Sequence, residues 1–430
     1  MGCSRPCSRS GNLPLGLTGD TGWLPDATAR LSVATGSSRA GTASVPSLDV
    51  TQLTLALRSF LDRTDVQTPY VVIDVDIAEA RYHQLAAAIP DAAIFYAVKA
   101  NPAMPLLERL VLVGSSFDVA SPAEIDRCLA AGASPERISY GNTIKKRRDI
   151  AYAVSCGVRR FSVDVDTELD KIADVAPGAE VCVRLRHDCG GADWPLSRKF
   201  GAEASDVVRV LGRAADAGMK LGVSFHVGSQ QRDLLAWDDT LEVVAGIAAR
   251  SAEAGSPLRF LNLGGGFPGS YVEEAPTIDE YGAAVRAALV KWFPEGAPEL
   301  MIEPGRYMVA DAGVLRSEVV LVSRRSPDDD ERWVYLDCGK FHGLAETMDE
   351  AIRYRLRTPH DGSPTGPVVL AGPTCDSADV LYEKNPYHLP LALAEGDMVD
   401  VLSAGAYTTT YSSVGFNGFP PLAEYCVSGR

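Results

Sequence analysis

The chain has 430 residues, of which 46% are hydrophobic and 23% are charged, and its formal net charge is −15. This length and composition predict a globular protein with two or three domains and substantial cores. The negative charge argues against nucleic acid or an anionic membrane surface as a partner, and it suits a small cationic molecule.

The first segment of the chain differs from the rest. Residues 1–47 are rich in Ser, Gly, Thr, Ala and Arg and lack periodicity, which predicts a disordered N-terminal extension. It contains no apolar core typical of a secretory signal. The opening MGCSRP has proline at position 6, where a myristoylation site requires serine or threonine.

From residue 48 the pattern becomes regular. VTQLTLALRSFLDR predicts an amphipathic helix, TPYVVIDVD a strand, and IAEARYHQLAAAIP a second helix. We expect residues 48–74 to pack against a later β domain.

Eight strand-like runs then alternate with helical stretches: AIFYAVKA, SSFDVAS, RISYGNT, RFSVDV, AEVCVRLR, KLGVSFHVGS, RFLNLGGG and PELMIEPGR. This rhythm over roughly 240 residues predicts a (β/α)8 barrel, assigned to residues 75–312. The remainder, 313–430, consists of strands and Gly/Pro turns and predicts a mainly β domain that completes the active site.

The stretch FYAVKANP places one lysine, Lys99, at the end of an apolar strand. Partial burial there would lower the pKa of its ammonium group and free the amine to act as a nucleophile. The alternative is an ordinary lysine whose stem is buried at a strand end.

Two later strand ends also carry polar groups. HVGSQ places His226 and Ser229 at a strand end, where the imidazole could stack on an aromatic cofactor and the hydroxyl could donate to a phosphate. A hydrogen-bonded core histidine is the alternative. The glycines of GGGFPG, Gly266 among them, allow backbone N–H groups to approach a phosphate, although a tight turn explains them equally well.

EPGRYMVADAG supplies Glu303 at a strand end, followed by Gly305 and Arg306. A carboxylate there can hold a pyridinium proton while the loop and the arginine contact a phosphate.

The predicted β domain adds a thiol and a carboxylate, Cys375 and Asp376, in GPTCDSAD. A buried structural cysteine is the usual alternative, but the adjacent aspartate and turn favour an exposed loop. GAYTTTY presents Tyr407, which could bond a phosphate. LAETMDEAI brings Glu346, Asp349 and Glu350 together; they form either a solvated helix face or a counter-ion for a substrate ammonium.

In this order, these motifs resemble the pyridoxal-phosphate (PLP) decarboxylases of the ornithine, lysine, diaminopimelate and biosynthetic-arginine group, over residues 55–425. GPTCDSAD, GAYT, FNGF and LAETMDEAI look most like the bacterial ornithine/lysine type. Diaminopimelate decarboxylases usually carry Glu after the cysteine, where this chain has Asp376. The resemblance implies an alanine-racemase-like barrel with a β domain, PLP as cofactor, and a homodimer with shared active sites.

The resemblance also implies roles for individual residues. Lys99 binds the cofactor covalently, Glu303 keeps its pyridine nitrogen protonated and His226 stacks on its ring. Cys375, supplied by the partner subunit, protonates the α-carbon after carbon dioxide leaves. The remaining roles are orientation of the cofactor by Asp118, Glu124 and Arg184, phosphate binding by Ser229, Gly266, Gly305, Arg306 and Tyr407, and binding of the distal substrate ammonium by Asp349 and Asp376.

The predicted activity is decarboxylation of a basic L-amino acid, in the order ornithine, lysine, arginine, with diaminopimelate as a further possibility. A catalytically inactive regulatory homologue would have lost the lysine, the cysteine or the phosphate loop, and all three are present. A racemase on the same barrel needs a second base, typically tyrosine, where this chain has Cys375. The scattered cysteines, without CxxC or zinc-ligand spacing, predict a cytoplasmic protein, and no apolar run is long enough for a transmembrane helix.

Overall fold

Eight apolar runs form a closed barrel of parallel strands in the computed structural model, which describes residues 53–63 and 65–429. Parallel strands are covered on both faces, so they require near-continuous apolar sequence, as these runs have. The strands are β2 (Ala92–Ala97), β3 (Ser116–Val119), β4 (Ile138–Tyr140), β5 (Arg160–Val163), β6 (Glu180–Arg184), β8 (Lys220–Ser224), β10 (Phe260–Asn262) and β11 (Glu299–Ile302).

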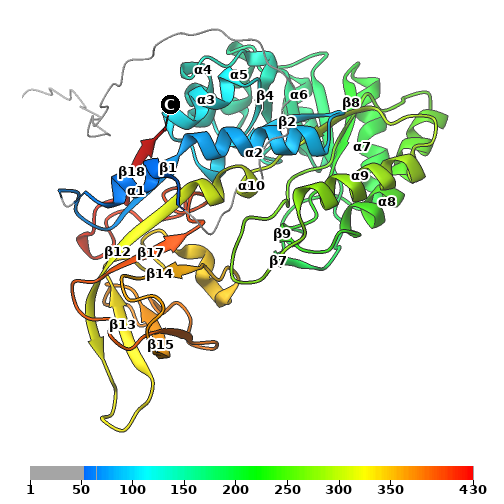
Figure 1. Ribbon diagram of the computed structural model, residues 1–430. Coiled ribbons are helices and arrows are strands. Elements are labelled where there is room, and N and C mark those ends of the chain that lie inside the picture. The colour runs from blue at the N-terminus through cyan, green and yellow to red at the C-terminus, as the bar shows by residue number, and fades with distance from the viewer. Residues whose placement is uncertain (1–52, 64, 430) are drawn as a thin grey trace, which may run out of the picture. The chain divides into compact units, whose positions relative to one another are not determined.

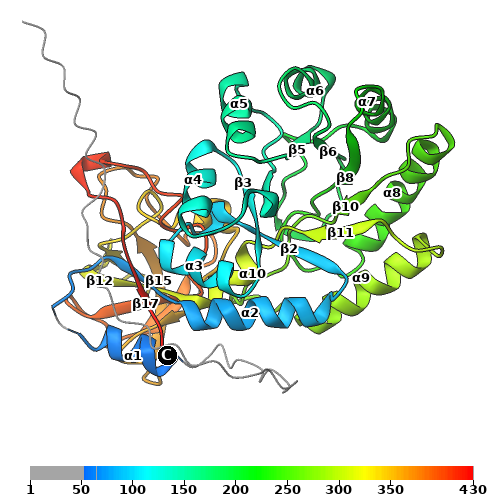
Figure 2. The same ribbon diagram turned by 90° about the horizontal axis from the view of Figure 1, so that it is seen from above.

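Helices surround these strands (Figures 1 and 2). Capping side chains fix several of their starts: Asp74 accepts the Asp76 N–H at α2, and Thr277 forms a reciprocal capping box with Glu280 at α9. The helices are α2 (Val75–Ala88), α3 (Met104–Leu112), α4 (Pro122–Ala130), α5 (Arg147–Ser155), α6 (Asp166–Ala173), α7 (Ala204–Asp216), α8 (Ala236–Glu253), α9 (Ile278–Trp292) and the short α10 (Arg306–Val309).

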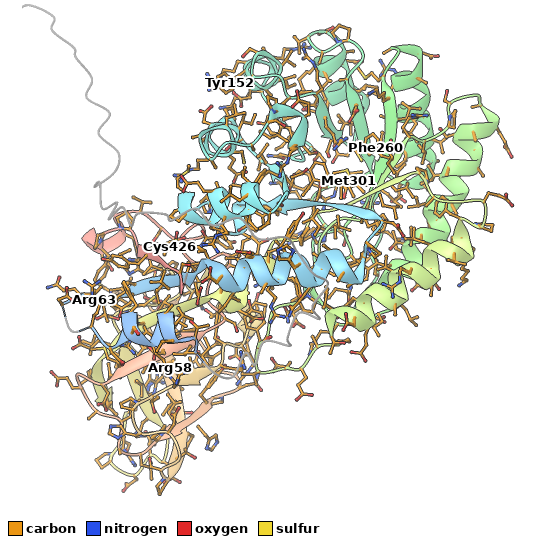
Figure 3. The ribbon with its side chains drawn as sticks, turned by 45° about the horizontal axis from the view of Figure 1, so that its top comes forward. Arg58, Arg63, Tyr152, Phe260, Met301 and Cys426 are labelled. Atoms are coloured by element: carbon orange, nitrogen blue, oxygen red, sulfur yellow. The ribbon has the colours of Figure 1, made fainter. Side chains whose placement is uncertain are left out.

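Part of the barrel interior is filled by a small buried cluster of Phe95, Cys182, Phe260 and Met301, of which Figure 3 labels Phe260 and Met301. The guanidinium of Arg160 lies 5.1 Å from the Phe95 ring and 5.3 Å from the Phe260 ring. Such packing makes the barrel a filled core rather than a pore.

The second domain contains an eight-stranded, mainly antiparallel sheet built on the long strand β12 (Gly313–Ser323). A short helix, α1 (Leu55–Leu61), precedes β1 (Tyr70–Asp74), which pairs antiparallel with β12 and parallel with β18 (Ala423–Val427). Both ends of the described chain therefore meet in one sheet. Its other strands are β13 (Arg332–Leu336), β14 (Leu356–Arg357), β15 (Thr365–Ala371), β16 (Tyr387–Pro390) and β17 (Met398–Leu402).

The structure confirms the predicted fold, a (β/α)8 barrel followed by a mainly β domain. A separate two-stranded ribbon, β7 (Ala192–Trp194) with β9 (Ser229–Gln231), follows the barrel strands β6 and β8. The predicted extension 1–47 lies outside the described residues. Within the described ranges, no helix is long and apolar enough to cross a membrane.

Candidate active site

A cavity of about 410 Å³ lies at the carboxyl ends of the barrel strands, where barrels of this kind place their active sites. Its lining includes residues that end or follow β2, β3, β6, β8 and β11. Ten of the predicted site residues line it: Lys99, Asp118, Arg184, His226, Ser229, Gly266, Glu303, Gly305, Arg306 and Tyr407.

Lys99 stands in a single 3₁₀ turn, Val98–Ala100, directly after β2. Its Nζ lies 3.2 Å from Asp118 Oδ2, and 51% of its side-chain surface remains accessible. Desolvation in the cavity acts to lower the pKa of Lys99, but the charge of Asp118, with smaller contributions from Tyr407 and Glu303, outweighs it and raises the pKa. The predicted lowering of this pKa is therefore wrong for the cofactor-free cavity.

Glu303 follows β11 and faces the same cavity. Its Oε1 accepts a hydrogen bond of 2.5 Å from Asn262 Nδ2 at the end of β10. Burial, and next the charge of Asp118, raise the pKa of the Glu303 carboxyl to about 7. A cationic N–H group that binds beside it would favour the carboxylate form.

His226 follows β8 and is held as a neutral ring. The Gly228 N–H donates to its Nδ1 over 3.0 Å, so the ring proton of the neutral imidazole is on Nε2. Burial, and then the charges of Arg184 and Lys99, place the pKa of His226 well below its ordinary value. An uncharged flat ring can pack against an aromatic ligand without repelling Lys99 and Arg184.

Two glycines let the backbone close around one end of the cavity. Gly266 has φ +107°, and a Cβ there would lie 2.7 Å from the Gly228 carbonyl oxygen. A Cβ on Gly305 would lie 2.7 Å from the Tyr407 hydroxyl. Both positions therefore exclude side chains and leave the small, donor-rich space that a phosphate group requires.

Arg306, the first residue of α10, is buried with Glu346 in a two-pronged ion pair of 2.6 and 2.7 Å. Its other N–H groups donate to Tyr271 at 2.8 Å and to Ser229 Oγ at 3.1 and 3.2 Å. All five donors of the guanidinium are thus used within the protein. Ser229 accepts from Arg306 and keeps its own proton for a ligand, so Arg306 can act on a phosphate through Ser229.

Arg184 and Glu124, both predicted to orient the cofactor, differ in their position relative to the cavity. Arg184 ends β6 and lines the cavity with its guanidinium 5.7 Å from the Phe200 ring; burial lowers its pKa. Glu124 is not among the lining residues. It lies in the first turn of α4 and accepts a 2.6 Å hydrogen bond from the Ala120 N–H, which fixes the chain just after Asp118.

Of the four site residues predicted in the β domain, Tyr407 lines this cavity and the other three are not among its lining residues. Cys375 is exposed, as its neighbouring aspartate and turn predict, and its N–H donates to Asn417 Oδ1 over 2.9 Å. Asp376 is exposed and accepts from the Ala378 N–H. Asp349 has 95% of its side chain exposed and lies 3.7 Å from Lys384. One chain therefore does not bring these groups to Lys99, and their roles remain predictions.

Some lining residues escaped the sequence analysis. The loop between β7 and α7 contributes Arg198, Lys199 and Phe200, and the loop after β4 contributes Asn142. A basic and aromatic group, SRKF, between the barrel strand β6 and the helix α7 was the available signal. Tyr271, which supports Arg306, follows GGGFPGS and carried no local signature.

The raised pKa of Glu303 predicts a pH effect on stability. In the unfolded chain this carboxyl titrates near 4.5, and in the folded cofactor-free protein near 7. The folded state therefore binds more protons in that window, and its stability falls as pH rises through it. We expect Glu303→Gln to gain stability over wild type by on the order of 1–2 kcal/mol between about pH 5 and about pH 8.

Thermal unfolding of the two cofactor-free proteins at both pH values measures this difference. The Gln side chain keeps an oxygen that can accept from Asn262 and does not titrate, so the pH-dependent part of the difference reports the Glu303 carboxyl. A gap between the two proteins that stays constant with pH would contradict the account of Glu303.

The residues present fit an aromatic aldehyde that carries a phosphate. Lys99 supplies an accessible amine for the aldehyde, and Glu303 supplies a carboxylate for a ring nitrogen. Ser229 and the backbone around Gly266 and Gly305, which we call the glycine cradle, can bind the phosphate. The cavity volume lies in the range typical of small-molecule sites.

Comparison with known proteins agrees with this fit. Residues 75–310 match the family described as "Pyridoxal-dependent decarboxylase, pyridoxal binding domain". A lysine/ornithine decarboxylase of Selenomonas ruminantium is 34% identical, over 82% of this chain and 88% of that protein. Antizyme inhibitor 2 of Xenopus laevis is 31% identical, over 84% and 81%.

The structures agree as well. The lysine/ornithine decarboxylase of Vibrio vulnificus, solved with putrescine, superposes with a TM-score of 0.76 at 29% identity, covering 86% of this chain and 96% of that one. The matched family region spans the barrel and the lining residues from Lys99 to Arg306. This chain belongs to the PLP-dependent decarboxylases of the ornithine, lysine and arginine family.

Proposed function

We propose that the protein converts L-ornithine to putrescine and carbon dioxide. The observation that carries this proposal is the cavity itself, in which the accessible amine of Lys99 and the carboxylate of Glu303 face one enclosed space beside a glycine cradle. The choice of ornithine rests on the likeness of GPTCDSAD, GAYT, FNGF and LAETMDEAI to ornithine/lysine enzymes and on the named activity of the Selenomonas relative.

When bound, PLP accepts the electron pair that is left when the α-carboxylate departs as carbon dioxide. The protein residues make this favourable by position and charge. Lys99 holds the cofactor and moves protons at its amine, while Asp118 at 3.2 Å keeps that amine in place. Glu303 keeps a proton at the pyridine nitrogen, which stabilises the developing charge more than it stabilises the bound substrate.

The other cofactor contacts proposed here divide between ring and phosphate. His226, neutral and flat, packs on the ring, and Arg184 and Asp118 fix its orientation. Glu124 acts indirectly, because it fixes the chain just after Asp118. Ser229, Gly266, Gly305 and Tyr407 bind the phosphate, with Arg306 acting through Ser229.

The distal ammonium of the substrate needs acidic groups, and we propose Asp349 and Asp376 for this role. Both are exposed in the single chain, which suits residues that meet a second copy. We infer a two-fold dimer in which Cys375 and Asp376 of one subunit complete the cavity of the other.

Complementation tests that dimer. We expect Lys99→Ala and Cys375→Ala each to make little diamine alone, and their mixture to recover activity. Random exchange makes about half of the dimers mixed, each with one intact site, so recovery should approach roughly a quarter of wild type. Mass-tagged chains verify exchange; no recovery despite exchange would place each site within one chain.

Steady-state assays test the substrate. We expect kcat/KM to fall in the order L-ornithine, L-lysine, L-arginine, with meso-diaminopimelate the poorest. One methylene is worth only about 1–3 kcal/mol of discrimination, so the ratio of ornithine to lysine should be roughly 10 to 200. A higher kcat/KM for L-lysine than for L-ornithine would support the decarboxylation reaction but contradict ornithine as the preferred substrate.

A regulatory homologue without activity is the second candidate, because antizyme inhibitor 2 is among the relatives. That role requires neither an accessible lysine nor an intact glycine cradle, and this chain has both. Binding of PLP without carbon dioxide release from any basic amino acid would favour it.

A further inference from the structure

The turn that carries Lys99 is held from outside the barrel, by the β domain. The Lys99 carbonyl accepts from Thr410 Oγ1 over 2.9 Å, and the Ala100 carbonyl accepts from the Tyr407 N–H over 2.8 Å. Two successive peptide groups of this turn are thus fixed by residues more than 300 positions away. The barrel strand alone does not set the position of the lysine backbone.

The next residue, Asn101, is fully buried and uses every polar atom of its side chain. Its Nδ2 donates to the Gly405 carbonyl at 3.1 Å and to Glu424 Oε2 at 2.7 Å, and its Oδ1 accepts from the Ala103 N–H at 3.0 Å. Since an amide has two donor hydrogens, both are spent on the β domain. Asn101 therefore joins the lysine turn, the start of α3 and two segments of the second domain.

Glu424 is the far end of this connection. Its Oε2 also accepts from Thr409 Oγ1 over 3.0 Å. Burial raises the pKa of the Glu424 carboxyl, and the hydrogen bonds from Asn101 and Thr409 partly oppose that rise. A partly buried carboxyl whose hydrogen-bond donors, Asn101 and Thr409, are both neutral is costly at a strand position. This cost favours a role for Glu424 in holding other groups in place.

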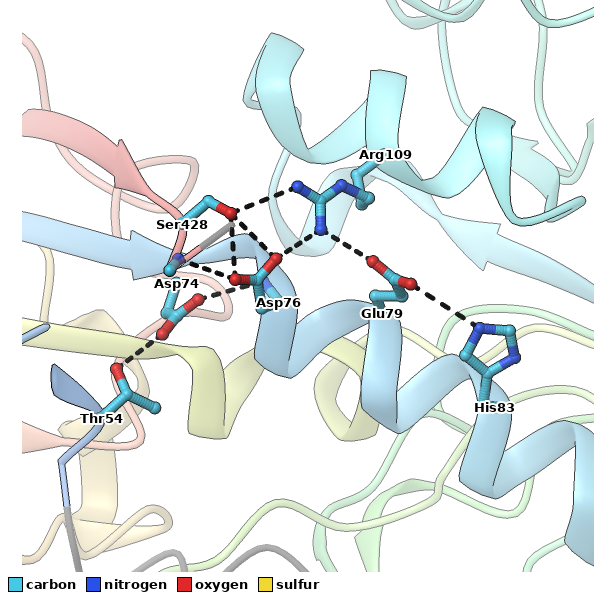
Figure 4. A network of polar contacts seen from close by, with 8 residues as sticks. Thr54, Asp74, Asp76, Glu79, His83, Arg109 and Ser428 are labelled. Atoms are coloured by element: carbon cyan, nitrogen blue, oxygen red, sulfur yellow. Dashed lines mark hydrogen bonds and ion pairs between the residues drawn. The ribbon is translucent and has the colours of Figure 1, made fainter. Parts of the chain in front are cut away.

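The strand that carries Glu424 is anchored along its length. β18 pairs in parallel with β1 from Ala423 to Val427. After β18, Ser428 Oγ and the Gly429 N–H donate to Asp76 at the start of α2. Asp76 also accepts a hydrogen bond from Arg109 of α3 (Figure 4). Glu424 is consequently a fixed point against which Asn101 can be held.

We propose that Glu424 and Asn101 are positioning residues for Lys99, through which the β domain sets the lysine turn at the carboxyl end of β2. The lysine side chain is long and flexible, so its amine is located chiefly by its backbone and by Asp118. A displacement of about 1 Å at a reacting group costs up to roughly a hundredfold in rate. This inference rests on the proposed role of Lys99 and adds the device that holds it.

The test compares Glu424→Leu, which removes the acceptor, with Glu424→Gln, which retains an oxygen for Asn101 and Thr409. Asp74→Asn is the control, because Asp74 is a buried carboxyl on the adjacent strand β1, bonded to Thr54 and to the start of α2. For each purified protein, the Kd for PLP is measured by absorbance titration, together with kcat, KM and Tm.

We expect Glu424→Leu to raise the Kd for PLP about tenfold and to lower kcat about tenfold, with KM changed less than about twofold. Glu424→Gln should stay within about twofold of wild type in all three. Asp74→Asn should lower Tm without changing the Kd or kcat. If Glu424→Leu does not fold, Thr410→Val removes only the hydroxyl that holds the Lys99 carbonyl, at an exposed position, and should shift both quantities about threefold.

Unchanged PLP affinity and kcat in the folded variant would overturn the inference. So would equal effects of Glu424→Leu and Asp74→Asn, since these would trace the loss to general instability. Failure of the proposed function looks different: wild-type protein itself would then show no lysine-bound PLP absorbance and no carbon dioxide release.

Discussion

Lys99→Ala should abolish the visible absorbance of lysine-bound PLP and lower turnover by several orders of magnitude. The reason is that one amine performs two tasks: it anchors the cofactor and it moves protons at the site of reaction. Lys99 is placed for both, with half of its side chain accessible to the cavity and its Nζ 3.2 Å from Asp118. Absorbance spectra after removal of free cofactor, with single-turnover carbon dioxide release, measure the two losses separately.

The chain offers a matched control. Lys199 also lines the cavity, but it lies in the loop between β7 and α7, with its Nζ 4.8 Å from the Phe200 ring centre. Lys199→Ala should retain the absorbance band. Retention of the band in Lys99→Ala and its loss in Lys199→Ala would reverse the assignment of the anchor.

Cys375→Ala should change the product rather than stop the release of carbon dioxide. Without the thiol, bound PLP would take the proton in place of the α-carbon. Hydrolysis of the C=N bond by one water molecule would then release an aldehyde and leave the cofactor in its amine form. Turnover should then stall after a few cycles, and added PLP should restart it. Mass spectrometry of the products and the absorbance of the amine form of the cofactor measure this partition.

Cys156 provides the control for Cys375, because it is a partly buried free thiol on the outer side of the barrel, at the end of α5. Cys156→Ala should make only the diamine at the wild-type rate. If Cys375→Ala also makes only the diamine at that rate, Cys375 has no part in proton transfer.

The sequence was sufficient for the barrel and for most of the cavity, because both depend on local patterns. Apolar runs between helices predict parallel strands, and the ends of such strands converge on one face. Lys99, Glu303 and His226 each follow a strand, so their meeting could be foreseen from chain order alone.

What the sequence could not predict depends on contacts between distant segments. The pKa of Lys99 is raised because Asp118 of the next strand lies against it, and no local pattern gives that distance. The acidic group at 346–350 divides in three directions: Glu346 pairs with Arg306, Glu350 binds the 384–385 turn, and Asp349 faces outward with φ 54°. Its residues sit in a broken turn, where helical spacing does not apply.

The central claim is that this chain decarboxylates a basic amino acid at Lys99 with PLP. Purified protein loaded with PLP and given L-ornithine labelled at the carboxyl carbon should release one labelled carbon dioxide for each putrescine formed. In a separate sample without substrate, borohydride reduction should leave a phosphopyridoxyl group on the peptide that contains Lys99. Labelled carbon dioxide absent with ornithine, lysine and arginine alike, or the phosphopyridoxyl group on another lysine, would contradict the account.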